Sequence, residues 1–223
     1  MNTYVGQNFG GVLRGMEEKH KFQLSDKDRD MYIKLEEDRV IEEIAAKAEP
    51  CIGCNKVLNE LFTGGKPQYT MAVVSSSALR RVEASLKKAG QTEYFSDRVF
   101  SAATSLIPPT SKPNPKIYIH AMDKLSVKPE ECIAVEDSVS GMRAAVDAGI
   151  YTIGYIGCYL DTHRADDDKT AKDQQSAEEQ ASDQAKLQEF SNTLTSWGAK
   201  VVMTDWSEFP GILRDLEAKA QKE

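Results

Sequence analysis

Residues 132–149, CIAVEDSVSGMRAAVDAG, contain the pattern that decides the fold. The run Cys132–Val135 is short and apolar, which is typical of a buried strand. Glu136 and Asp137 follow this run directly, and the small residues of 141–147 then predict a closely packed helix. A buried strand that leads through charged side chains into a helix is typical of a parallel α/β sheet.

The same alternation of strands and helices continues over most of the chain after residue 50. Further strands are predicted at residues 69–75, 98–101, 151–155 and 200–203, and helices at 79–86, 115–125 and 210–219. Helices between strands indicate a parallel sheet, because parallel neighbours need a crossover connection. The predicted fold class is therefore α/β, with a Rossmann-like parallel sheet flanked by helices.

Two segments depart from this alternation. Residues 1–50 read as helical, with Ser25 or Asp26 at the start of the longer helix, and no strand pattern interrupts them. We expect a partial α-helical cap domain there and a Rossmann-like core at 51–223. Within the core, a polar insertion is predicted at about 159–190, because DDDKTAKDQQSAEEQ lacks apolar periodicity. We expect that insertion to be solvated and partly disordered, with a regulatory or partner-binding role as the less favoured alternative.

Composition and charge exclude several classes of partner. The 223 residues carry a net charge of −7, so no basic stripe is expected to bind nucleic acid or an anionic membrane. No apolar run approaches the roughly 20 residues that span a bilayer. The sequence MNTYVGQNFGGVLRG lacks the apolar core of a signal peptide, so we expect a cytoplasmic location. Nothing in the sequence indicates the oligomeric state.

Polar side chains of complementary kinds follow the predicted strands. Ser75 and Ser76 close one apolar run, Lys112 lies in the loop TSKPNPK, and Glu136 and Asp137 close another run. In a parallel α/β sheet, ligands bind at the carboxyl ends of the strands, so these groups are expected at one edge. Hydroxyls and an ammonium suit a phosphate, and adjacent carboxylates suit Mg²⁺.

Each of these features also has an ordinary structural explanation. Ser75 could cap the next helix, because serine is a favoured N-cap residue. Lys112 by itself could be a surface lysine. The acidic pair Glu136 and Asp137 is harder to explain in this way, since desolvating two neighbouring carboxylates without a cation is costly.

Three stretches, AVVSSS, TSKPNPKIY and IAVEDSVSGMRAAVDAG, resemble the second, third and fourth motifs of the haloacid dehalogenase superfamily. The similar subgroup contains β-phosphoglucomutase-like and phosphoglycolate-phosphatase-like enzymes. The resemblance implies a Mg²⁺-dependent phosphohydrolase that acts on a small phosphorylated metabolite. It implies that Ser75, with Ser76, binds the transferring phosphoryl group, that Lys112 steadies its charge, and that Asp137 with Glu136 holds Mg²⁺. One departure is Lys116, where the family usually has Asp after its KPxP sequence.

The first motif of the family, an apolar strand that runs into DxD, has no match in this sequence. The only DxD candidates lie in SDKDRDMY, residues 25–32, where we predict a helix start with acidic residues at its positive end. The nucleophilic Asp is therefore expected to be absent. The core is also expected to miss its central strand, which would lie between the strands that end at Ser75 and Glu136.

Three hypotheses follow. The first is a phosphatase by family resemblance, which is inactive or impaired because the nucleophilic Asp is absent. The second is a catalytically dead protein that still binds a phospho-ligand or has a regulatory role. The third is a truncated fragment, or a chain that a second chain completes. The sequence does not distinguish a phosphatase from a phosphomutase.

Overall fold

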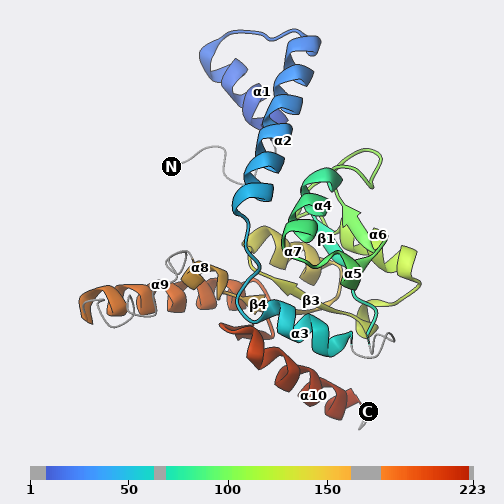
Figure 1. Cartoon of the computed structure of the whole chain (residues 1–223), viewed down its shortest axis with the longest axis vertical. Coiled ribbons are helices and arrows are strands. Elements are labelled where there is room, and N and C mark those ends of the chain that lie inside the picture. The colour runs from blue at the N-terminus through green and yellow to red at the C-terminus, as the bar shows by residue number, and fades with distance from the viewer. Residues whose placement is uncertain (1–8, 63–68, 162–176, 221–223) are drawn as a thin grey trace.

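A computed structural model describes residues 9–62, 69–161 and 177–220 of the chain. The chain begins with two helices, α1 (Phe9–His20) and α2 (Asp26–Lys47), which form a hairpin that projects away from the strands (Figure 1). The prediction of helices in the first 50 residues is confirmed for the described part. Ser25 is the N-cap of α2, since its Oγ accepts a hydrogen bond of 3.1 Å from Asp28 N.

The strands form two parallel sheets. In one, β1 (Val73–Ser75) pairs with β2 (Val99–Ser101). In the other, β4 (Tyr151–Tyr155) lies between β3 (Ile133–Glu136) and β5 (Val201–Met203). The α/β class with parallel strands is confirmed, and no ladder joins β1 to β3 in the described part of the chain.

On the edge of β1 that faces away from β2, a lysine side chain bonds to the backbone. Val73 N donates to Arg98 O at 2.9 Å, and Ser75 O accepts from Ala102 N at 2.8 Å, so both residues bond toward β2. Residues of a strand alternate in the side to which their backbone groups point, and Val74 therefore presents its backbone to the other side. There Val74 O accepts a hydrogen bond of 2.8 Å from Lys112 Nζ. Whether a further strand belongs between β1 and β3 stays a prediction.

Helices cover both sheets. The described helices of the core are α3 (Cys54–Leu61), α4 (Leu79–Lys88), α5 (Thr92–Phe95), α6 (Lys116–Leu125), α7 (Val139–Asp147), α8 (Cys158–Asp161), α9 (Ala177–Ser196) and α10 (Phe209–Ala220), with short 3₁₀ turns at Pro129–Glu131 and Trp206–Glu208. The largest group of buried apolar residues joins α6 and α7 to β2 and β3 and includes Phe100, Ile117, Ala134 and Ala144.

The helix α9 begins at residue 177, within the predicted polar insertion, and whether residues 159–190 form an insertion stays a prediction. Leu187 and Leu194 are seven residues apart, which is two helical turns, so both lie on one face. Leu194 is only 1% exposed, and together with Met142 and Ile156 it belongs to an apolar cluster against which Leu187 packs. Leu194 is therefore buried against the core, whereas Leu187 is half-buried. The rest of the polar stretch, 162–176, lies outside the described residues.

Ion pairs fasten the hairpin to the core. Arg80 in α4 lies 3.0 Å from Asp38 and 3.5 Å from Glu37, and Arg81 pairs with Glu36. All three acidic residues belong to α2, which makes its main contact with the core along α4. A cap domain at residues 1–50 stays a prediction, because these contacts show attachment and not a separate unit.

The start of α6 supports a first stability prediction. Lys116 is exposed at its first turn, where the partial positive charge of the helix disfavours a cation, and its backbone N donates to Asn114 Oδ1 at 3.0 Å. We expect Lys116→Asp to raise the free energy of unfolding by about 0.5 kcal/mol, measured by urea denaturation. Lys124→Asp, in the last turn of the same helix, should have the opposite sign. Equal effects of the two substitutions would contradict the prediction.

Candidate functional site

The predicted site residues meet at the carboxyl ends of β1 and β3. Lys112 connects the two strands: its backbone N donates to Ser76 Oγ at 2.9 Å, and its Nζ donates to Val74 O at 2.8 Å. The same Nζ forms an ion pair with Oε1 of Glu136, the last residue of β3. The structure thus brings together one lysine and the ends of two strands.

Lys112 is a buried lysine, and the surface-lysine alternative is wrong. Its side chain is 10% exposed, and that of Glu136 is 7% exposed. An ammonium has three N–H donors, and the described residues Val74 and Glu136 receive two of them. The third can be offered to a phosphoryl oxygen at this edge.

The serines at the end of β1 do not cap the following helix, so that alternative is also wrong. The N-cap of α4 is Ala78, which makes no side-chain capping bond, and Leu79 N instead donates to Thr104 Oγ1 at 3.2 Å. Ser75 Oγ accepts a bond of 3.1 Å from Ser77 N. A hydroxyl oxygen that accepts in this way still has its own hydrogen to donate, which suits a bound anion.

Two residues that the sequence did not single out surround the carboxylate of Glu136. The hydroxyl of Tyr118, in α6, donates a hydrogen bond to Oε1 of Glu136. The same oxygen accepts a hydrogen bond from Lys112 Nζ. On the other side lies Gly141 of α7, where a Cβ atom would overlap the carboxylate. Both residues occur inside recognisable motifs, but only the packing of α6 and α7 against β3 brings them to Glu136.

Asp137 has a more open position. It is exposed, its backbone O accepts a bond of 2.9 Å from the Tyr159 hydroxyl, and Cys158 Sγ lies 4.0 Å from Oδ2. Burial, and then the nearby Asp137 charge, raise the pKa of the Cys158 thiol to about 12, so the thiol stays neutral at ordinary pH. The neutral Cys158 thiol therefore places no second negative charge beside the Asp137 carboxylate.

The acidic pair suits a partly hydrated Mg²⁺ ion. No group of three or more His, Cys, Asp or Glu side chains gathers anywhere in the described ranges. Mg²⁺ nevertheless commonly takes one or two carboxylates and completes its octahedron with water and substrate phosphate. Asp137 offers exposed oxygens, whereas Oε1 of Glu136 is already bonded to Lys112 and Tyr118. The donor set fits such an ion, with Asp137 as the more available ligand.

The DxD candidates of SDKDRDMY lie elsewhere. Asp26 and Asp28 belong to the first turn of α2, Asp26 pairs with Arg29 at 2.7 Å, and Asp28 N bonds to Ser25. Figure 1 shows this end of α2 remote from the strands. The predicted helix start is confirmed, and these carboxylates do not belong to the site.

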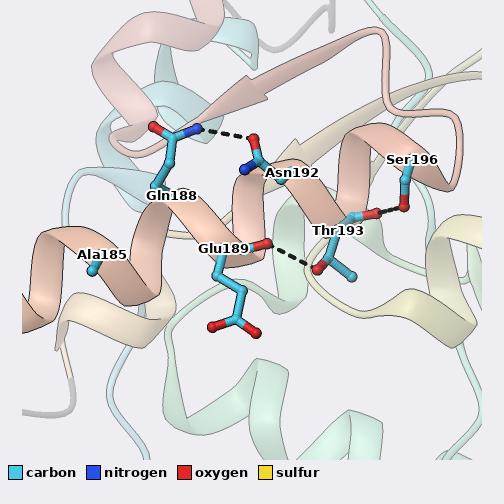
Figure 2. A pocket seen from close by; sticks show the side chains of 6 residues that line it. All are labelled: Ala185, Gln188, Glu189, Asn192, Thr193 and Ser196. Atoms are coloured by element: carbon cyan, nitrogen blue, oxygen red, sulfur yellow. Dashed lines mark hydrogen bonds between the residues drawn. The ribbon is translucent and has the colours of Figure 1, made fainter.

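A pocket lies along α9. Figure 2 shows its lining residues: Ala185, Gln188, Glu189, Asn192, Thr193 and Ser196. The drawn bonds run along one helix, with Gln188 donating to Asn192 at 3.0 Å and Thr193 donating to Glu189 O at 2.8 Å. A surface of one helix whose polar groups bond to each other gives no converging set of reactive groups, so the strand-end site is the better candidate.

The fold and the site define a class of parallel α/β proteins with polar and charged side chains at the strand ends, and comparison with known proteins identifies the family. The model of the haloacid dehalogenase-like hydrolases matches residues 3–155, and the chain belongs to this family. None of the helices in the described part is long and apolar enough to cross a membrane.

Individual relatives cover different shares of the chain. It is 35% identical over 80 residues to 6-phosphogluconate phosphatase of Escherichia coli, and 34% identical over 83 residues to a phosphorylated carbohydrates phosphatase of Thermotoga maritima. These matches cover 36% and 37% of this chain, and 35% and 37% of the relatives, so the matched region spans about a third of their length. A haloacid dehalogenase-like protein of Agrobacterium tumefaciens has the same fold, with a TM-score of 0.60 at 19% identity over 96% of this chain and 81% of that one.

Proposed function

We propose that this chain carries the phosphate- and magnesium-binding part of a phosphohydrolase for a small phosphorylated metabolite, in the β-phosphoglucomutase- and phosphoglycolate-phosphatase-like subgroup. The observation that carries the proposal is the buried Lys112, which joins the end of β1 to Glu136 at the end of β3. The similarity to a 6-phosphogluconate phosphatase and to a phosphorylated carbohydrates phosphatase supports the substrate class.

Each site residue has a role that follows from its contacts. Ser75 and Ser76 donate hydrogen bonds to phosphoryl oxygens, and Lys112 offers its remaining N–H as a fixed positive charge. Asp137, with Glu136, would hold Mg²⁺, which when bound offsets the negative charge of the phosphate. We assign residues 1–50 to a partial α-helical cap domain and residues 51–223 to the core.

A second candidate function is binding of a phospho-ligand without turnover. It is favoured by the environment of Glu136, whose carboxylate is bonded to Lys112 and Tyr118 and is not free to attack a phosphoryl group. Its described neighbour Asp137 is the more available carboxylate, and we assign it to the metal. Among the described residues we assign no other acidic side chain to the carboxyl ends of β1 and β3. Attack on the phosphoryl group by a carboxylate then lacks its nucleophile, and we expect phosphatase activity to be absent or impaired.

Asp137→Asn tests both functions. In the presence of Mg²⁺, we expect the substitution to weaken binding of inorganic phosphate at least tenfold by calorimetry, because the metal loses its exposed carboxylate. The matched control is Asp147→Asn, an exposed Asp at the far end of α7, which should bind as the wild type does.

Hydrolysis of p-nitrophenyl phosphate, with and without EDTA, then separates the candidates. Turnover that requires Mg²⁺ and is lost in Asp137→Asn supports the phosphohydrolase. Phosphate binding without turnover supports the binding protein. A folded wild type that neither binds nor hydrolyses phosphate rules out both.

A further inference from the structure

Tyr118 contacts both members of the Lys112–Glu136 ion pair. Its hydroxyl donates to Glu136 Oε1, and its ring centroid lies 5.0 Å from Lys112 Nζ, which is within the range of a cation–π contact. Tyr118 is 7% exposed and packs in the same apolar cluster as Ile117 and Ala121 of α6. The tyrosine is therefore a rigid side chain that reaches from a well-packed helix to the site.

The carboxylate of Glu136 has little freedom to move. Tyr118 and Lys112 bond to Oε1, while the other carboxylate oxygen lies against Gly141, where even a Cβ atom would not fit. A carboxylate confined on both sides points its charge in one direction. Removing one of the confining groups should let it rotate.

The hydroxyl of Tyr118 donates to Glu136 Oε1. A neutral phenol donates to Glu136 without competing for its charge, so the full charge of the carboxylate remains to hold Lys112.

We infer that Tyr118 is a positioning residue: its hydroxyl fixes the Glu136 carboxylate, which in turn aims the Lys112 ammonium at the bound phosphoryl group. Tyr118 itself does not touch the phosphate in this arrangement and acts through Glu136. The inference rests on the proposed phosphate site and deepens it, since it adds a residue from α6 to those at the strand ends.

Tyr118→Phe isolates the hydroxyl, because phenylalanine keeps the ring that packs in α6 and faces Lys112. We expect the dissociation constant for inorganic phosphate, measured by calorimetry with Mg²⁺ present, to rise about tenfold. The matched control is Tyr69→Phe, which removes another tyrosine–carboxylate bond, to Glu217 near the C-terminus of the described chain. That variant should bind phosphate as the wild type does.

The Glu136→Gln background shows whether Tyr118 acts through Glu136. If it does, Tyr118→Phe should change phosphate affinity much less in Glu136→Gln than in the wild type, whereas a merely structural role would give the same fold-change in both. Equal fold-changes, or an unchanged affinity in Tyr118→Phe, overturn the inference and leave the proposed site intact. A wild type that binds no phosphate overturns the site itself, so the two failures are distinguishable.

Discussion

Lys112→Met should lower the free energy of unfolding by about 3–5 kcal/mol. The substitution leaves the Glu136 carboxylate buried without its cation, and removing one partner of a buried ion pair typically has an effect of this size. It also takes the hydrogen bond from Val74 O, at the β1 edge that faces β3. Urea denaturation measures the change, and phosphate binding should be lost in the same variant.

The double variant Lys112→Met/Glu136→Gln gives the sharper test. Neutralising the carboxylate removes the buried charge, so the double variant should recover part of the stability that Lys112→Met loses. Lys116→Met, four residues along and exposed, should change stability by less than about 0.5 kcal/mol. If Lys112→Met lowered the free energy of unfolding as little as Lys116→Met does, the Lys112–Glu136 ion pair would not be buried in solution.

Gly141→Ala should lower the free energy of unfolding by about 2 kcal/mol, although alanine is the better helix former. The new Cβ would overlap the Glu136 carboxylate, which cannot swing away without breaking its bonds to Lys112 and Tyr118. Overpacking of this kind typically costs about 1–3 kcal/mol, more than the roughly 1 kcal/mol that Gly→Ala adds within a helix. Thermal and urea unfolding measure the result.

Gly211→Ala in α10 is the matched control, because its Cβ would approach no neighbour closer than 3.8 Å. It should stabilise the protein by about 0.5 kcal/mol. In a Glu136→Ala background, which removes the obstructing carboxylate, Gly141→Ala should lose most of its effect. A destabilisation that persists there would place its cause in the backbone of α7 and not at Glu136.

Local pattern predicted most of the elements correctly. The strand β4 lies at the predicted residues 151–155, β2 and β5 each begin one residue later than predicted, and β3 is shifted by one residue at both ends. These segments are short apolar runs with clear stop signals, which is information held within a few neighbouring residues. The first strand was predicted too long, since only Val73–Ser75 of the run 69–75 pairs with a neighbour.

The pattern failed where burial depends on distant partners. The helix α9 reads as polar, and only the packing of Leu194 with Met142 and Ile156 shows that one face is buried. The eight-residue helix α3 buries Val57 and Leu58, which belong to two different apolar clusters. Neither cluster can be read from the segment itself.

The sequence by itself determined the α/β class, the strand ends and the identity of the polar residues placed there. These features depend on the periodicity of apolar residues, on turn residues and on residue type, which are local properties of the sequence. Tertiary structure decided that the strands form two sheets, that Lys112 is buried and bonded to Val74, and that Tyr118 and Gly141 confine Glu136. Strand pairing and side-chain contacts join residues far apart in the chain, so their energies appear only when the helices pack against the strands.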